Sequence, residues 1–316
     1  MNKNEHLKLL EKAANKLGLS TSFSTHNQVN YSLFVSDNKT YCLLDGYKLG
    51  YYPNNKKHFI QLAHSKNVSE NYLKSRGFRT LDSFDVRCRD YKTQEKLFER
   101  LAKKRLGEFP LLIKPETGLK GKGIVIVQNQ QELQRYAKKL YANKTNFLIQ
   151  NINYQQEYRI LYAMGTVVFV HTKSFPTITG DGNKTARELF NLIEPDKRDP
   201  VFFASNLEKQ SLKIHSVVPK GLKIPYHVTR KGTHEIVYCD SIPPGINKWA
   251  KSLAKALSAD TVGIDVFIDG PLEKSDSYTI IEVNGNPGFT YLKSKYKRAD
   301  VVTEHCNRIL KTYFKI

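Results

Sequence analysis

The ten residues from Ile281 to Thr290 read Ile-Glu-Val-Asn-Gly-Asn-Pro-Gly-Phe-Thr and continue an apolar run that begins at Tyr278. Side chains two residues apart on a strand point to the same face, so Glu282 and Asn284 should share one face. Such alternation alone is typical of polar residues on the solvent-exposed face of a sheet. An acid within an apolar run needs a partner, however, because an ionised group is costly to bury alone. The stretch therefore predicts a strand that carries a functional site.

A second apolar run, Gly263-Ile264-Asp265-Val266-Phe267-Ile268-Asp269, also contains acids and precedes the first by a polar loop. If the two runs pair as a hairpin, Asp265 can lie across from Glu282 and Asn284. Two carboxylates and an amide oxygen are hard ligands that suit Mg²⁺, which shares its remaining positions with water and phosphate. The two runs together predict a magnesium site made by Asp265, Glu282 and Asn284.

A third segment combines glycines with lysines: Lys114-Pro115-Glu116-Thr117-Gly118-Leu119-Lys120-Gly121-Lys122-Gly123. Glycines let backbone N–H groups approach an anion closely, and lysines add mobile positive charge. The segment is neither a Walker P-loop nor a GxGxxG motif. It fits a hairpin loop that covers a phosphate, although an ordinary exposed hairpin explains it too.

The rest of the chain alternates between helical and strand periodicity without a regular βαβ rhythm. This pattern indicates an α+β protein with antiparallel sheets, and short strands with tight turns are expected between residues 31 and 52. The predicted helices are 7–17, 64–77, 130–141, 185–193 and 246–257. The predicted strands are 111–115, 123–127, 147–150, 158–170, 262–268 and 278–283.

Composition excludes several classes of protein. The 316 residues can bury one or two cores. No run approaches the roughly 18 apolar residues of a membrane helix, and residues 1–6 lack the apolar core of a signal peptide, so a cytoplasmic protein without membrane contact is expected. The 4 cysteines form no CxxC pair and have no histidine at zinc-ligand spacing, so neither a disulfide framework nor a zinc site is indicated.

The formal net charge of +20 attracts anions of many kinds, including nucleotides, acidic peptides, nucleic acid and acidic lipids. A basic helix is expected over residues 92–105, with Leu97, Phe98 and Leu101 on its other face. Such a helix usually has a solvated basic face, so nucleic acid is not the favoured partner. A second basic cluster can either present charge to an acidic substrate or form a solvent-facing loop: Lys293, Lys295, Lys297 and Arg298.

Taken together, residues from about His64 to Thr290 resemble the ATP-grasp superfamily. The stretch 281–290 is similar to the closing metal motif of D-alanine–D-alanine ligases. The residues Gly263-Ile264-Asp265 and the stretch 179–189, Thr-Gly-Asp-Gly-Asn-Lys-Thr-Ala-Arg-Glu-Leu, are more similar to cyanophycin synthetase and the fused glutathione synthetases. The resemblance implies an ATP-grasp fold, in which two α+β subdomains grip ATP, with a smaller N-terminal α/β region. The implied domains are an N-terminal region 1–106, a lid subdomain 107–156 with the glycine loop, and a C-terminal subdomain 157–316 with the metal site.

The resemblance also implies roles for individual residues. ATP and two Mg²⁺ ions would be bound, with Mn²⁺ as an alternative, and the metals would be held by Asp265, Glu282 and Asn284. Arg159 and Lys173 would face the reacting centre as catalytic residues. Gln150-Asn151-Ile152 would be the hinge whose backbone contacts adenine, and Glu157 would lie at the ribose or phosphate end. The full nucleotide-binding set is Lys66, Lys114, Gly118, Lys120, Gly121, Lys122, Gly123, Gln150, Asn151, Ile152 and Glu157.

Two departures from the family bear on specificity. The hinge has Gln150 where an acid is common, and Gly263 stands where D-alanine ligases carry an arginine two residues before the metal aspartate. Specificity for D-alanine is therefore not implied.

The expected function is that of a carboxylate–amine ligase, which forms an amide or peptide bond through an acyl phosphate while ATP becomes ADP and phosphate. Its substrates would be small-molecule or peptide carboxylates and amines, acidic ones included, and ligases of this type are often homodimers. One alternative is an ATP-grasp phosphotransferase. Another is a basic protein that binds nucleic acid or an acidic polymer and has a degenerate ATP site, although the retention of Lys114, Asp265, Glu282 and Asn284 argues against decay of that site.

Overall fold

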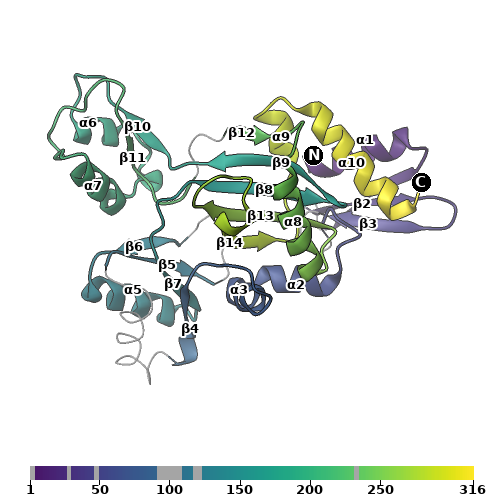
Figure 1. Cartoon of the computed structure of the whole chain (residues 1–316), viewed down its shortest axis with the longest axis horizontal. Coiled ribbons are helices and arrows are strands. Elements are labelled where there is room, and N and C mark those ends of the chain that lie inside the picture. Colours follow the sequence, from purple (N-terminus) through teal and green to yellow (C-terminus); the bar gives the residue numbers. More distant parts are fainter. Residues whose placement is uncertain (1–3, 27–29, 46–49, 91–108, 117–122, 231–234) are drawn as a thin grey trace. The chain divides into compact units, whose positions relative to one another are not determined.

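The computed structural model describes residues 4–26, 30–45, 50–90, 109–116, 123–230 and 235–316 (Figure 1). The chain forms two compact units. Unit 1 comprises Met1–Thr80, Tyr158–His171 and Ile236–Ile316, and unit 2 comprises Leu81–Glu157 and Thr172–Glu235. These two compact units do not test the predicted subdomains 1–106, 107–156 and 157–316, which stay a prediction.

Unit 1 is built on a five-stranded sheet of order β12-β9-β8-β13-β14. The strands are β12 (Ile236–Tyr238), β9 (Thr166–Lys173), β8 (Glu157–Ala163), β13 (Thr261–Ile268) and β14 (Tyr278–Asn284). The predicted single strand 158–170 is wrong, because the chain turns at Met164-Gly165 and makes two neighbouring strands. Both residues have positive φ, 45° and 94°, which is the conformation of a tight type I′ hairpin turn.

Three helices cover one face of this sheet: α2 (Lys57–His64), α3 (Lys66–Ser75) and α8 (Pro244–Leu257). Alternate residues of the strands point into this layer, among them Ile160 and Ile264, and they pack with Phe59, Leu73 and Leu253. Because apolar residues recur about every 3.6 residues along α8, they form one apolar stripe, and this stripe packs on the apolar face of the sheet.

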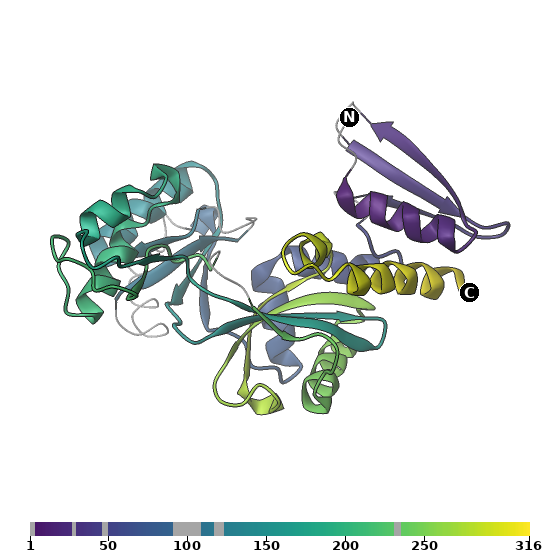
Figure 2. The same ribbon diagram turned by 90° about the horizontal axis from the view of Figure 1, so that it is seen from above.

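The opposite face is covered by the N-terminal and C-terminal segments. The N-terminal segment folds as α1 (Glu5–Lys16) on a small antiparallel sheet of β1 (Ser20–His26), β2 (Asn30–Ser36) and β3 (Tyr41–Asp45), and α10 (Ala299–Phe314) runs beside α1 (Figure 2). The short helix α9 (Thr290–Ser294) precedes α10. Phe289 is fully buried at the centre of this layer, together with Leu161 and Phe169 of the sheet.

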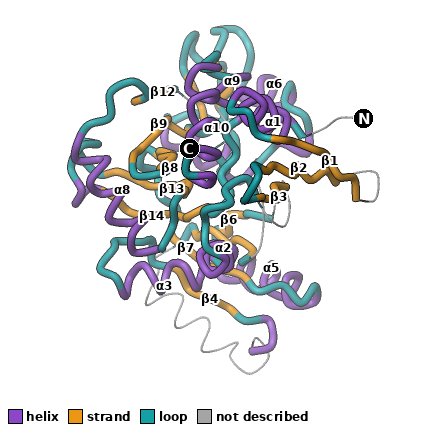
Figure 3. The backbone as a smooth tube through the Cα atoms, turned by 90° about the vertical axis from the view of Figure 1, so that its right-hand side faces the viewer, coloured by secondary structure: helices purple, strands orange, loops and turns teal. Residues whose placement is uncertain are grey.

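Unit 2 contains a four-stranded antiparallel sheet of order β4-β7-β5-β6. The strands are β4 (Ser83–Val86), β7 (Phe147–Asn151), β5 (Leu111–Pro115) and β6 (Val125–Val127), and α5 (Gln130–Ala142) packs on one face (Figure 3). Leu133 and Ala137 of α5 meet Ile113, Phe147 and Ile149 of the strands. Residues 112, 114, 148 and 150 alternate with these and point to the other face.

The remainder of unit 2 contains β10 (Thr177–Thr179) paired with β11 (Lys223–Pro225), and the helices α6 (Ala186–Asn191) and α7 (Pro200–Lys209). The stretch 179–189 forms the start of α6. Asp181 accepts backbone N–H groups of Asn183 and Lys184, and Thr185 and Glu188 form a capping box. The hydrogen bonds with Lys184 and Asn183 hold the pKa of the Asp181 carboxyl well below its usual range. These residues therefore have a structural role in beginning the helix.

The α+β class, the antiparallel pairing and the predicted helices and strands other than 158–170 are confirmed where they are described. The elements that were not predicted are β1, β4, β10, β11, β12, α2, α7, α9 and α10. Residues 92–105 and most of the glycine loop lie outside the described residues. In the part of the chain that is described, no helix is both long and apolar enough to cross a membrane. Short 3₁₀ turns occur at Cys88–Asp90, Pro195–Lys197 and Ser275–Ser277.

Candidate active site

The two acidic runs pair as an antiparallel hairpin, as the sequence predicts. In the register of β13 and β14, Asp265 lies opposite Glu282 and Gly263 lies opposite Asn284. Because partners in an antiparallel pair share a face, the three predicted metal ligands lie together on one face of unit 1. A register shift between Asp265 and Val266 interrupts the ladder at this point. Bulges of this kind are common beside active sites, because they redirect a side chain.

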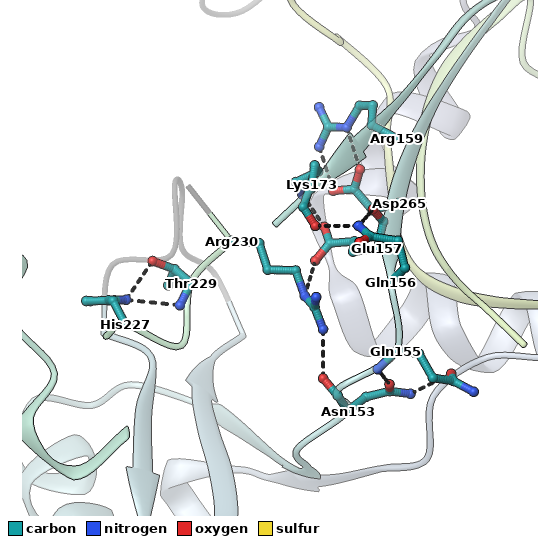
Figure 4. A network of polar contacts seen from close by, with 10 residues as sticks. All are labelled: Asn153, Gln155, Gln156, Glu157, Arg159, Lys173, His227, Thr229, Arg230 and Asp265. Carbon is teal, nitrogen blue, oxygen red and sulfur yellow. Dashed lines mark hydrogen bonds and ion pairs between the residues drawn. The ribbon is translucent and has the colours of Figure 1, made fainter. Parts of the chain in front are cut away.

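Asp265 is 2% exposed and receives two charge-assisted hydrogen bonds from Arg159 of the neighbouring strand β8 (Figure 4). Nη2 of Arg159 lies 2.6 Å from Oδ2 of Asp265, and its Nε donates to Oδ1. Burial by itself would lower the pKa of Arg159, but the adjacent Asp265 carboxylate outweighs it and raises that pKa above its ordinary value. The pair is therefore ionised, and each charge depends on the other.

Glu282 is the more open carboxylate, with 35% of its side chain exposed and its Oε1 at 3.9 Å from Nη2 of Arg159. Asn284 accepts the backbone N–H of Asn286 on its Oδ1, at 2.9 Å, and an amide oxygen has a second lone pair. Two carboxylates and an amide oxygen on one face fit Mg²⁺. The assignment of the metal ligands stays a prediction. Of the three predicted ligands, Glu282 has the fewest contacts with other protein groups that the structure describes.

Gly263 is required by packing. A Cβ at this position would lie 2.9 Å from Cβ of Pro287, in the loop that follows Asn284. The departure from the arginine of D-alanine ligases thus has a steric reason, since Pro287 takes the space.

We expect Gly263→Ala to lower the free energy of unfolding by about 1–3 kcal/mol, the usual cost of overpacking a close contact. Urea denaturation followed by circular dichroism measures this change. Ser252→Ala, at an exposed position of α8, is the control, and equal stability of both variants would contradict the steric role.

In unit 2, the predicted nucleotide-binding residues Lys114 and Gln150 lie on the same face of the four-stranded sheet and are 7% and 4% exposed. Nε2 of Gln150 has no hydrogen-bond partner among the described residues, which is costly for a buried donor. Asn151 ends strand β7 and Ile152 follows it. The sheet therefore presents a buried cation and an unused donor on its face away from α5.

Glu157 and Lys173 form an ion pair in unit 2, as Figure 4 shows, and Arg230 joins them. Nε of Arg230 lies 3.2 Å from Oε2 of Glu157, its Nη2 donates to the carbonyl of Asn153 at 2.8 Å, and its guanidinium lies 4.0 Å from the centre of the Phe175 ring. Burial lowers the pKa of Arg230 to about 10 against the opposing effect of Glu157. Sequence reasoning missed Arg230, because it stands alone in a polar segment that matches no motif.

The remaining predicted residues are distributed between the two units. Lys66 begins α3 in unit 1, behind the N-cap Ser65. Gly123 lies in unit 2 with φ of 75°, and a Cβ there would meet Cγ of Pro115 at 2.8 Å, so glycine is required. The other residues predicted for the glycine loop lie outside the described residues: Gly118, Lys120, Gly121 and Lys122.

Solved structures with the same arrangement define the class of fold. A bifunctional glutathione synthetase from Pasteurella multocida aligns over 99% of this chain and 44% of its own, with a TM-score of 0.54 and 17% identity. A D-alanine–D-alanine ligase from Bacillus anthracis in complex with ATP aligns over 83% of this chain and 68% of its own, with a TM-score of 0.51 and 18% identity. The chain has the ATP-grasp fold.

Curated proteins with similar sequences are also named as enzymes of ligase type. The cyanophycin synthetase of Crocosphaera subtropica is 32% identical over 207 residues, which are 58% of this chain and 24% of that protein. The chain spans about a quarter of the length of the curated relatives that it matches. No protein-family model matches it. The predicted resemblance to ATP-grasp carboxylate–amine ligases is confirmed by these similarities.

Proposed function

We propose that the protein is an Mg²⁺-dependent and ATP-dependent carboxylate–amine ligase. The observation that carries this proposal is the register of β13 and β14, which brings Asp265, Glu282 and Asn284 onto one face beside Arg159. Oxygen donors of this kind suit the metal that accompanies ATP. The similarity to ATP-grasp ligases supports the same reaction class.

The reaction has two steps. An oxygen of the substrate carboxylate attacks the γ-phosphorus of ATP, the bond from that phosphorus to the β–γ bridging oxygen breaks, and ADP leaves. The amine nitrogen then attacks the acyl carbon, the carbon–oxygen bond to phosphate breaks, and phosphate and the amide are released with loss of a proton from nitrogen. Both steps require neutralisation of charge and in-line positioning. Bound Mg²⁺ would neutralise phosphate oxygens.

The residues of the chain would divide this work. Glu282, Asp265 and Asn284 would hold the metal, and Arg159 would keep Asp265 oriented while its positive charge faces the reacting centre. Lys114 and Lys66 would contact the phosphates, Gln150 to Ile152 would contact adenine, and Glu157 with Lys173 would act near the ribose and the reacting groups.

The substrates follow from chemistry and similarity. Cyanophycin synthetase and a glutathione biosynthesis protein are among the relatives by name, so amino acids and short peptides are the first carboxylates and amines to consider. The charge of +20 favours acidic substrates among them. A cytoplasmic location and a homodimer stay predictions.

The proposal is tested by incubating the protein with ATP, Mg²⁺ and pooled amino acids and dipeptides, and recording released phosphate and new masses. We expect phosphate release to depend on the added substrates and to match new amide product mole for mole. Omission of Mg²⁺ is the control and should stop both.

Other outcomes separate the alternatives. A phosphoester product without free phosphate would establish a phosphotransferase. If no acceptor in the pool stimulates turnover, but nucleic acid or an acidic polymer binds with steep salt dependence, the ligase proposal is wrong and the binding protein is favoured.

A further inference from the structure

The loop Gly285–Thr290, which directly follows the candidate metal ligand Asn284, is held by the N-terminal segment of unit 1. Nε2 of His6 accepts the backbone N–H of Phe289 at 3.1 Å and that of Thr290 at 3.4 Å. Nδ1 of His6 lies 3.2 Å from Oδ1 of Asn4. Since Nε2 is the acceptor, Nδ1 carries the proton and donates it to Asn4. Both ring nitrogens of His6 therefore make hydrogen bonds.

The ring of His6 is fixed by its neighbours. It stacks on Tyr51 with the ring centres 4.4 Å apart, and the edge of fully buried Phe289 meets it at 4.7 Å. Burial lowers the pKa of His6 to about 4, so the ring is neutral at pH 7 and Nε2 can accept. A Cβ on Gly288 would lie 3.1 Å from Nε2, so the loop approaches the ring closely.

A short chain of hydrogen bonds leads from this segment to the metal ligand. The backbone N–H of Tyr51 donates to Oδ1 of Asn286 at 2.9 Å, and the backbone N–H of Asn286 donates to Oδ1 of Asn284 at 2.9 Å. Oδ1 of Asn284 is the oxygen predicted to contact the metal. Its orientation therefore depends on the conformation that Tyr51 and His6 impose on the loop.

Asn55 ties the same loop to the beginning of β13. Its Nδ2 donates to the carbonyls of Gly285 and Thr261, at 2.9 and 2.8 Å, and its Oδ1 accepts the backbone N–H groups of Asp260 and Thr261. All four hydrogen-bonding positions of the amide are used, and they bridge the end of β14 to the start of β13. Asn55 thus links the two strands that carry the metal ligands.

We propose that the N-terminal segment completes the metal site, with His6 as the positioning residue that holds the loop after Asn284. The alternative is that the segment contributes only to the core. Ligands of a metal depend on the groups that orient them, and loss of such a group typically weakens metal affinity about 10–100-fold. The inference rests on the proposed function, because that proposal supplies the metal.

The test compares two substitutions of His6. His6→Phe keeps an aromatic ring on Tyr51 but has no acceptor for the loop, whereas His6→Gln loses the ring and places an amide oxygen where Nε2 lies. Lys12→Ala, exposed on the same helix, is the control. The affinity for Mn²⁺ is measured by the electron paramagnetic resonance signal of the free ion, and thermal unfolding is followed on the same samples.

We expect His6→Phe to weaken Mn²⁺ affinity about ten-fold, His6→Gln to recover most of the loss, and Lys12→Ala to match the wild type. If His6→Phe lowers only the melting temperature and leaves affinity unchanged, His6 is a core residue and the inference is overturned. Wild-type protein that binds Mn²⁺ but joins no substrates would sink the ligase proposal, while the His6 variants would still decide this one. Wild-type protein that binds no Mn²⁺ overturns both.

Discussion

Glu282→Gln is expected to fold normally and to lose ATP turnover by about 10³-fold or more. The side chain is 35% exposed and Arg159, its nearest cation among the described residues, is 3.9 Å away, so the substitution removes charge without leaving a buried group unpaired. An ion pair of this length, with one partner partly exposed, contributes little to stability. A bound metal supplies several kcal/mol of charge stabilisation in the transition state, and about 4 kcal/mol corresponds to that loss in rate.

Phosphate release measures this effect, with circular dichroism and urea denaturation as checks on the fold. Glu304→Gln, which neutralises an exposed acid on α10, is the matched control and should keep full turnover. Retention of more than a tenth of the wild-type rate by Glu282→Gln, with the same Mg²⁺ requirement, would remove Glu282 from the metal site. The assay presupposes turnover by the wild type, which the substrate pool establishes.

The hairpin of the candidate site was predictable because its information is local. Alternation within 281–284 fixes which side chains share a face, and the polar loop before Tyr278 allows only a short connection back to β13. Arg159 could not be placed in this way. It lies 106 residues from Asp265 in the sequence, and no spacing rule joins two strands so far apart. Only the family resemblance pointed to the reacting centre.

The misses have physical causes of the same kind. In the apolar run 158–170 the only turn signal is Gly165, and its partner in the turn, Met164, adopts a positive φ that a non-glycine residue rarely takes, so the turn was overlooked. Helix α7 was overlooked in a polar segment, although Asp199 caps it and Pro200 begins it. His6 lies just before the predicted helix 7–17 and was assigned no role, because its contacts with Phe289 and Thr290 depend on the tertiary fold.

Breaking the Arg159–Asp265 pair is expected to destabilise the protein by about 3–5 kcal/mol, the usual cost of leaving one buried partner without the other. Asp265 is 2% exposed and Arg159 has 19% of its side chain exposed, so neither group can reach water freely. Arg159→Met removes the guanidinium from the buried carboxylate, and Asp265→Leu leaves the guanidinium with only the more distant carboxylate of Glu282 at 3.9 Å. Urea denaturation should show both losses in the absence of metal. Lys197→Met, which breaks the exposed pair with Glu194, is the control and should cost less than about 1 kcal/mol.

The double variant Arg159→Met with Asp265→Leu decides what the pair contributes. Replacing both charges with apolar groups removes the desolvation cost together with the attraction, so the double variant should be more stable than either single variant. Its turnover should nevertheless stay absent, since the metal would have lost a ligand. Strictly additive losses in the double variant would mean that the two side chains act independently. Recovered stability without recovered activity would indicate that this buried pair serves the chemistry of the site more than the fold, because apolar substitutes can replace its role in folding alone.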